Sequence, residues 1–462
     1  MKFKLPNTFV LLFALLALIA LSTWFVPGGQ YDTVLVNGKK VVDPDTFRHV
    51  PANPQGLVAL LTAPIKGFVE AALIIGFVLL VGGAFNVLHK TEAIDAMIKS
   101  VAKAHSRSQL VRVGLIPLFV TLFSIGGATF GMAEEAIPFV LIFIPLALAL
   151  RYDSVVGVAI PFVGSQIGFA TAFLNPFNVG IAQQIAGVPM FSGLGFRFVC
   201  WLVFTAVTIA FLMVYAARIK ADPRRSYTFA LDEEKRKSLD LSAFERFTGM
   251  TLRHKLVLWL FAATLGGMIV GVVKYEWYIH EIGALFLVMA IAVGLVTRLK
   301  ADDWVAAFVG GAKDMVSTAL VIALAKATVV LLRDGHIIDT LLHHLAPWVE
   351  SSSAIFSAQK MFVIQSVINF FIHSGTGQAA LTMPIMAPLA DLVGVTRQLA
   401  ILAFQFGELS TPIIPTSGIT VGVLALAGIP YTTWVRAMLK MQLAYFVIAL
   451  ILLGVGASIG WA

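Results

Sequence analysis

Stretches of apolar residues, separated by short polar segments, recur along the whole chain. A helix of about 20 apolar residues is long enough to cross the hydrocarbon core of a membrane. Nine such stretches predict nine crossings, and because nine is odd, the two ends of the chain are predicted to face opposite sides. The crossings are predicted at residues 8–26, 66–88, 153–187, 195–217, 255–273, 279–298, 310–332, 396–427 and 431–460.

Two further apolar regions, residues 110–150 and 359–395, predict re-entrant hairpins rather than crossings. The arms of the first region are about 15 residues long, which at about 1.5 Å per residue is shorter than the core of about 30 Å. Polar, glycine-rich segments separate the arms, at residues 124–131 and 373–378. Non-helical backbone at membrane depth persists only where protein or water satisfies its polar groups. Each hairpin tip therefore predicts a binding site.

Two of the long crossings are predicted to be broken helices. Asn-Pro-Phe-Asn-Val-Gly interrupts one at residues 175–180, and Thr-Pro-Ile-Ile-Pro-Thr-Ser-Gly interrupts the other at residues 411–418. Proline removes a backbone donor and clashes with the preceding turn, so the helix opens there. A single proline kink is common and needs no functional explanation. Four breaks at related positions instead favour one central site.

The two halves of the chain repeat one another. Residues 72–75 (Ala-Leu-Ile-Ile) are echoed by residues 319–322 (Ala-Leu-Val-Ile), and residues 186–189 (Ala-Gly-Val-Pro) by residues 427–430 (Ala-Gly-Ile-Pro). The first unit starts after one crossing and the second after six, so the two run through the membrane in opposite directions. The predicted fold is an all-α polytopic membrane protein with an inverted-topology repeat, about nine transmembrane helices and two re-entrant hairpins.

Composition agrees with this class. Hydrophobic residues make up 59% of the chain and charged residues 13%, with a mean hydropathy of +0.90, which excludes a water-soluble globular fold. Cys200, the single cysteine, excludes an intrachain disulfide framework. The chain has no Gly-x4-Gly-Lys-Ser/Thr sequence, so it carries no ATPase motif of this kind.

The basic residues predict the orientation of the chain. Of the 33 Lys and Arg residues, 22 fall on the side of the N-terminus and nine on the opposite side, while two more lie within a span. Cytoplasmic loops carry the excess of positive charge in such proteins. We therefore expect a multi-pass protein of the cell inner membrane with its N-terminus in the cytoplasm and its C-terminus in the periplasm.

Polar and acidic side chains at the breaks are the candidate substrate-binding residues. Helix N-termini attract anionic groups, and carbonyls freed at a break coordinate cations. A carboxylate within a membrane is costly and normally faces a cavity or a partner, for which Lys326 is available, so a structural ion pair stays open as an alternative. The candidates are Thr129, Gly131, Glu134, Glu135, Asn175, Asn178, Ser374, Thr376, Gln378, Glu408, Thr411, Thr416 and Ser417.

A coupling cation is the one further ligand that the breaks suggest. Asn175, Asn178 and Thr416 offer side-chain oxygens beside freed carbonyls, and the coupling ion would be Na⁺ or H⁺. No firm metal site and no organic cofactor are predicted. The expected partners are a small-molecule substrate and the lipid bilayer, with no nucleic acid.

Three motifs carry a resemblance to a known family. Residues 23–32 (Thr-Trp-Phe-Val-Pro-Gly-Gly-Gln-Tyr-Asp), residues 126–135 (Gly-Gly-Ala-Thr-Phe-Gly-Met-Ala-Glu-Glu) and residues 375–384 (Gly-Thr-Gly-Gln-Ala-Ala-Leu-Thr-Met-Pro) resemble the YfcC family of DcuC-like carriers, within the ion transporter superfamily. The resemblance implies a homodimer in which a scaffold domain supports a mobile, elevator-type transport domain. It also implies secondary transport of either C4-dicarboxylates or basic amino acids.

On this resemblance the chain is divided into scaffold and transport parts. The scaffold comprises residues 1–105 and 255–350, and the transport domain comprises residues 106–218 and 351–462. The charged segment at residues 219–254 is predicted to be a helical cytoplasmic linker with a solvated face and no chemical role.

The lining residues favour an amino acid antiporter over the alternatives. The residues at and beside the hairpin tips and breaks include Glu134, Glu135 and Glu408 but no Arg or Lys, whereas recognition of a carboxylate pair usually recruits Arg. A basic amino acid is therefore expected, with a C4-dicarboxylate carrier coupled to H⁺ or Na⁺ as the alternative and a channel less favoured. An enzyme is not expected, because the acidic pair has no matching nucleophile or metal set.

The predicted topology can be tested with two reporters. A reporter fused at the C-terminus should be active in the periplasm, and one inserted at Lys235 should be active in the cytoplasm, because of the odd number of crossings and the charge bias. Paired periplasmic and cytoplasmic reporter enzymes would measure both positions. Finding both reporters on one side would contradict the inverted repeat.

Overall fold

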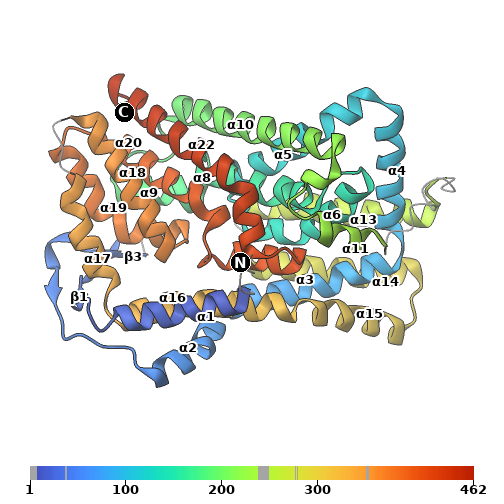
Figure 1. The fold of residues 1–462 in the computed structure, drawn as a ribbon, viewed down its shortest axis with the longest axis horizontal. Coiled ribbons are helices and arrows are strands. Elements are labelled where there is room, and N and C mark those ends of the chain that lie inside the picture. The colour runs from blue at the N-terminus through green and yellow to red at the C-terminus, as the bar shows by residue number, and fades with distance from the viewer. Residues whose placement is uncertain (1–7, 37–38, 238–248, 276, 278, 350–352) are drawn as a thin grey trace.

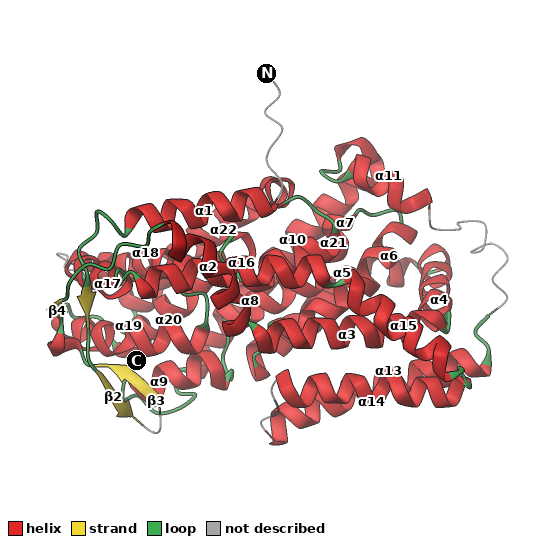
Figure 2. Cartoon of the chain, turned by 90° about the horizontal axis from the view of Figure 1, so that it is seen from below, coloured by secondary structure: helices red, strands yellow, loops and turns green. Residues whose placement is uncertain are grey.

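The structure is a computed structural model, and it describes residues 8–36, 39–237, 249–275, 277, 279–349 and 353–462. Nearly all of its regular structure is helical, with four short strands at one end of the molecule (Figures 1 and 2). Strand β1 pairs with β4, and β2 pairs with β3, both antiparallel. The strands are β1 (Gly29–Gln30), β2 (Thr33–Val36), β3 (Lys39–Val42) and β4 (Arg48–His49).

The first half of the chain contains α1 to α11. Helix α10 is the longest of them, and α7, α8 and α9 are short pieces of one interrupted span. The bounds are α1 (Thr8–Ser22), α2 (Leu57–Glu70), α3 (Ala72–Lys90), α4 (Ala93–Arg107), α5 (Gln109–Phe130), α6 (Val140–Ala149), α7 (Ser154–Val158), α8 (Gly164–Ala170), α9 (Ile181–Ile185), α10 (Leu194–Ala221) and α11 (Phe229–Lys237).

The second half contains α13 to α22. Helices α20 and α21 are the two pieces of its interrupted span. The bounds are α13 (Leu252–Tyr275), α14 (Ile279–Thr297), α15 (Ala301–Asp314), α16 (Val316–Asp334), α17 (Ile338–Leu345), α18 (Ala354–Phe371), α19 (Gly375–Leu392), α20 (Arg397–Gly407), α21 (Gly418–Ala427) and α22 (Tyr431–Ser458).

Three pairs of helices from the two halves match in length and follow the same order. Helices α2 and α15 have 14 residues each, α3 and α16 have 19 each, and α10 and α22 have 28 each. A single residue, Ala71, separates α2 from α3, and a single residue, Met315, separates α15 from α16. Helix α4 lies at one end of the molecule and α17 at the other (Figure 1). Equal lengths in the same order are what an internal repeat predicts.

By length and composition, eight helices in the described part of the chain can cross a membrane. Six of them coincide with predicted crossings, and two shorter apolar helices, Leu12–Ser22 and Ser154–Ala170, fall in two others. The remaining two, Gln109–Thr129 and Ala354–Phe371, are the first arms of the predicted hairpins. The chain is thus an all-α polytopic membrane protein, as its hydrophobic pattern predicts.

The predicted length of the first hairpin arm is wrong. Helix α5 has 22 residues and reaches about 33 Å, because the segment at residues 124–130 continues the helix instead of breaking it. Its glycines serve packing: a Cβ on Gly127 would collide with the carbonyl of Ser165, and one on Gly168 with the carbonyl of Ser124. Small residues let membrane helices approach closely. Helix α5 therefore packs tightly on α8 and ends only at Gly131.

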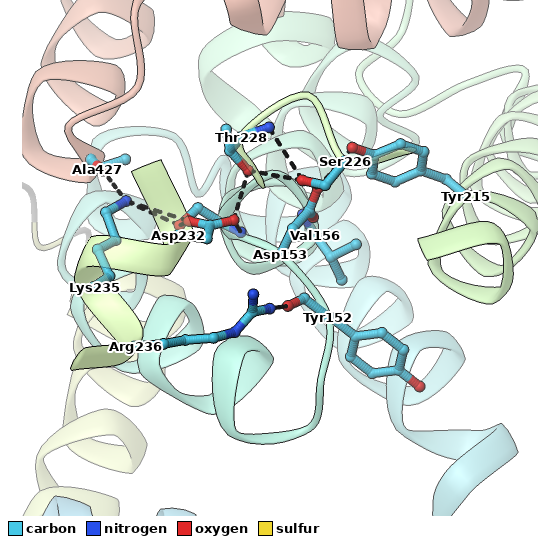
Figure 3. A network of polar contacts seen from close by, with 11 residues as sticks. Tyr152, Asp153, Val156, Tyr215, Ser226, Thr228, Asp232, Lys235, Arg236 and Ala427 are labelled. Carbon is cyan, nitrogen blue, oxygen red and sulfur yellow. Dashed lines mark hydrogen bonds and ion pairs between the residues drawn. The ribbon is translucent and has the colours of Figure 1, made fainter. Parts of the chain in front are cut away.

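Helix α11 has the solvated face predicted for the linker at residues 219–254, since Leu231, Glu233 and Glu234 are exposed, but its other face is docked on the protein. Asp232 on α11 is fully buried, and it accepts hydrogen bonds from the Ser154 amide at 2.9 Å, the Ser154 hydroxyl and the Thr228 hydroxyl at 2.7 Å (Figure 3). A buried carboxylate is tolerated when donors satisfy it in this way. The linker is thereby held against the start of α7.

Lys235 connects α11 to the other half of the chain. Its ammonium donates to the Ser154 hydroxyl at 2.9 Å and to the carbonyl of Ala427, the last residue of α21, at 2.7 Å (Figure 3). Burial lowers the pKa of Lys235, while the carboxylates of Asp232 and Asp153 oppose that shift. One helix of the linker thus contacts both interrupted spans.

Removal of the buried linker carboxylate should release α11. Asp232→Ala leaves the Ser154 amide and two hydroxyls without their acceptor, which should raise the rate of tryptic cleavage at Lys235 and Arg236 by about tenfold. Glu234→Gln is the matched control, because Glu234 lies on the same helix and is exposed. Limited proteolysis followed by mass spectrometry measures the effect, and equal cleavage in the two variants would contradict the docked linker.

Candidate functional site

A cavity of about 360 Å³ lies where the two hairpin tips and the two helix breaks meet. Its lining residues come from distant parts of the sequence, so the fold brings all four breaks together as predicted. From the tips and breaks they are Gly131, Ala133, Glu134, Phe177, His373, Ser374, Gly375, Thr376, Glu408, Thr411, Gly418 and Ile419. From α8 and the helices on the other side of the cavity they are Gln166, Phe169, Ala71, Ile74, Ile322 and Lys326.

Asn175 holds the first break against the first hairpin tip. Its side chain accepts from the Phe177 amide at 2.8 Å and donates to the Gly127 carbonyl at 3.3 Å. Gly131 has a φ of +78°, which glycine adopts without strain, and a Cβ there would lie 2.8 Å from Asn175 Oδ1. The glycine therefore allows both the turn and the close approach to Asn175.

Asn178 joins the first break to the second. Its amide nitrogen donates to the Phe169 carbonyl at 3.3 Å and to Glu408 Oε2. Thr376 at the second tip donates to the Phe177 carbonyl at 3.0 Å, so the second hairpin is tied to the first break as well. The Asn178–Glu408 and Thr376–Phe177 contacts join residues about 200 or more positions apart in sequence and set the shape of the cavity.

Side chains satisfy the carbonyls that the second break frees. The Thr420 hydroxyl donates to the Thr411 carbonyl at 2.6 Å, the Trp434 indole to Pro412 at 2.7 Å and the Tyr431 hydroxyl to Ile413 at 2.5 Å. The Thr416 hydroxyl donates to the Phe370 carbonyl. A polar group left unpaired at this depth would cost several kcal/mol. Side chains of the protein itself therefore satisfy the carbonyls of the open segment.

Six of the thirteen candidate residues line the cavity. They are Gly131, Glu134, Ser374, Thr376, Glu408 and Thr411. Of the others, Thr129 donates to the Ile125 carbonyl of its own helix. The remaining six do not line the cavity and are buried beside it: Glu135, Asn175, Asn178, Gln378, Thr416 and Ser417.

The neighbouring glutamates at the first tip have different surroundings. Glu134 lines the cavity, whereas Glu135 is only 6% exposed and its carboxylate accepts from the Ala133 amide at 2.9 Å. The sequence alone did not separate them, since both follow the same glycine-rich turn.

Three cavity residues with polar or charged side chains, Gln166, Lys326 and His373, lie outside the candidate set. Gln166 and His373 each have a buried ring or amide nitrogen with no hydrogen-bond partner among the described residues, and Lys326 projects from α16. Lys326 could have been selected by its charge within an apolar span, which is a strong indication of function. Gln166 has no comparable sequence indication, because its position depends on how α8 packs.

Comparisons with known proteins agree that the similar proteins are membrane transporters. The sequence model of the family described as "DcuC: C4-dicarboxylate anaerobic carrier" matches residues 5–457. The chain is 35% identical to the "Putative basic amino acid antiporter YfcC" of Escherichia coli K12, over 94% of this chain and 93% of that one. It is 28% identical to an uncharacterized protein of Haemophilus influenzae, over 99% and 98% of the two chains.

Two solved structures are similar at lower identity. The YdaH transporter of Alcanivorax borkumensis is 16% identical, with 99% of each chain covered and a TM-score of 0.42. MtrF of Neisseria gonorrhoeae, described in connection with a class of antimetabolite efflux pumps, is 18% identical, with 98% of this chain and 96% of that one covered and a TM-score of 0.44.

The two adjacent glutamates provide a matched test of the cavity. Glu134→Gln should reduce uptake of the transported substrate into proteoliposomes at least tenfold, because it removes a charge from the cavity wall. Glu135→Gln should keep most of the uptake, because an amide oxygen can still accept from the Ala133 amide. Equal loss in both variants at equal expression would show that the cavity wall does not distinguish them.

Proposed function

The chain belongs to the DcuC family of C4-dicarboxylate anaerobic carriers, and on that premise we propose that it is an antiporter of basic amino acids. It is a transporter, as the family match and the apolar helices indicate. The substrate class is our proposal, as are location in the cell inner membrane with a cytoplasmic N-terminus and assembly as a homodimer.

The charges that line the cavity carry the proposal. Glu134 and Glu408 contribute two carboxylates and Lys326 one ammonium. A basic amino acid bears the complementary set, with two cationic groups and one carboxylate. Complementary charges favour the correct partner and like charges oppose the wrong one. The relative from Escherichia coli carries a name of the same class.

A C4-dicarboxylate is the second candidate. The family description names this substrate, and the N-termini of α19 and α21, which line the cavity at Gly375 and Gly418, favour anionic groups. Two carboxylates would meet Glu134 and Glu408, however, so co-transport of H⁺ or Na⁺ would be needed to offset the repulsion. Asn178 Oδ1, buried and with no donor among the described residues, is a candidate ligand for such a cation beside Asn175.

Transport by this site requires two alternating states, for which we propose an elevator mechanism built on an inverted-topology repeat. The equal lengths of α3 and α16, and of α10 and α22, support the repeat. In such carriers, broken helices meet at the membrane midplane and one unit moves against the other. The mobile unit proposed here comprises residues 106–218 and 351–462.

Counterflow in proteoliposomes tests the substrate class. Vesicles loaded with unlabelled arginine, ornithine, lysine, succinate or fumarate are presented with the labelled compound at two pH values. Saturable exchange of at least one basic amino acid is expected, because its charges complement the cavity. Exchange of succinate or fumarate without any response to basic amino acids would overturn the proposal in favour of the second candidate.

A further inference from the structure

We propose that Lys326 binds the α-carboxylate of the substrate and so makes the carrier select amino acids over the amines that lack this group. The inference rests on the basic amino acid function proposed above and names the residue that determines one part of its specificity. It assigns a role to a charged side chain on α16, outside the hairpins and breaks.

The position of Lys326 is costly unless the side chain has a function. It lies within the span Ala301–Asp334, and its neighbours in sequence, Ala325 and Ala327, are fully buried. A lysine at such depth is unfavourable in a membrane, and it normally pairs with an acidic group or faces a cavity. Lys326 lines the cavity.

A static ion pair does not account for this lysine. Eight ion pairs are formed by side chains in the described part of the chain, and none includes Lys326. Glu134 and Glu408 line the same cavity, yet neither belongs to any of the eight ion pairs found in the described residues. The cavity thus holds separated charges of opposite sign, which a ligand with separated charges would bridge.

The same cavity presents further donors for a carboxylate. Gln166 lines the cavity, is 4% exposed and has an amide nitrogen with no partner among the described residues. The first residue of α21, Gly418, also lines the cavity beside Ile322 of α16, and it presents the positive end of its helix. The Lys326 ammonium, the Gln166 amide and the N-terminus of α21 together make an anion subsite.

The acidic side of the cavity suits the cationic groups of the same substrate. The Asn178 amide donates to Glu408 Oε2, which fixes the orientation of that carboxylate. A Cβ on Gly375 would lie 3.1 Å from Glu408 Oε1, so the second hairpin tip closes directly over the other oxygen. We therefore assign Glu408 and Glu134 to the cationic ammonium or guanidinium groups of the substrate, and Lys326 to its carboxylate.

The test compares substrates with and without the carboxylate. Wild-type and Lys326→Gln proteins are reconstituted, and kcat/KM is measured for arginine and for agmatine, its decarboxylated analogue. We expect wild type to prefer arginine and Lys326→Gln to lose about tenfold or more for arginine alone, because a charge-assisted hydrogen bond is lost. Lys326→Arg should keep the preference. Lys313→Gln, an exposed lysine on the adjoining α15, is the control and should behave as wild type.

The outcomes separate this inference from the proposed function. Loss of activity for arginine and agmatine in equal proportion, at normal expression, would assign Lys326 a structural role and overturn the inference. So would an unchanged preference in Lys326→Gln. Wild-type exchange of dicarboxylates alone would instead overturn the proposed function. Lys326→Met, which keeps the length of the side chain without its charge, replaces Lys326→Gln if that variant does not insert, and the same change in preference is expected.

Discussion

The structure depends on one constraint, that backbone polar groups within a membrane need partners from the protein itself. Four interruptions of helical structure meet near one cavity, and each would be unfavourable by itself. The side chains of Asn175, Asn178, Thr420 and Trp434 supply donors to the exposed carbonyls. The polar residues beside the cavity therefore serve first to make a binding site possible, and fewer of them remain to contact a ligand.

The same constraint explains why the cavity and its charges form one unit. The side-chain amide of Asn178 donates both to the Phe169 carbonyl and to Glu408 Oε2. A side chain anchored to the backbone of one half of the chain thus orients a carboxylate of the other half. Gly131 and Gly375 allow both hairpin tips to approach the breaks more closely than a side chain would permit. A ligand that displaced the Glu408 carboxylate would therefore also disturb Asn178 at the first break.

Sequence reasoning located the interruptions of helical structure and most of the spans, because proline, glycine and apolar length act locally. It failed where the role of a residue depends on contacts with residues distant in sequence. Gly127 looked like part of a break, yet it serves the packing of α5 on α8. The role of Asp232 was hidden because its donor, Ser154, lies 78 positions away. Glu134 and Glu135 could not be distinguished, because only the turn geometry decides which of them faces the cavity.

The docked helix α11 has a consequence for the energetics of any motion within the molecule. Lys235 spans the gap between the start of α7 and the end of α21 and bonds to both. These two hydrogen bonds stabilise only those arrangements in which the start of α7 and the end of α21 both lie within reach of the Lys235 side chain. A segment that joins the halves covalently thus also biases the balance between their arrangements. Sequence changes on α11 can therefore alter the balance between those arrangements without changing any residue that lines the cavity.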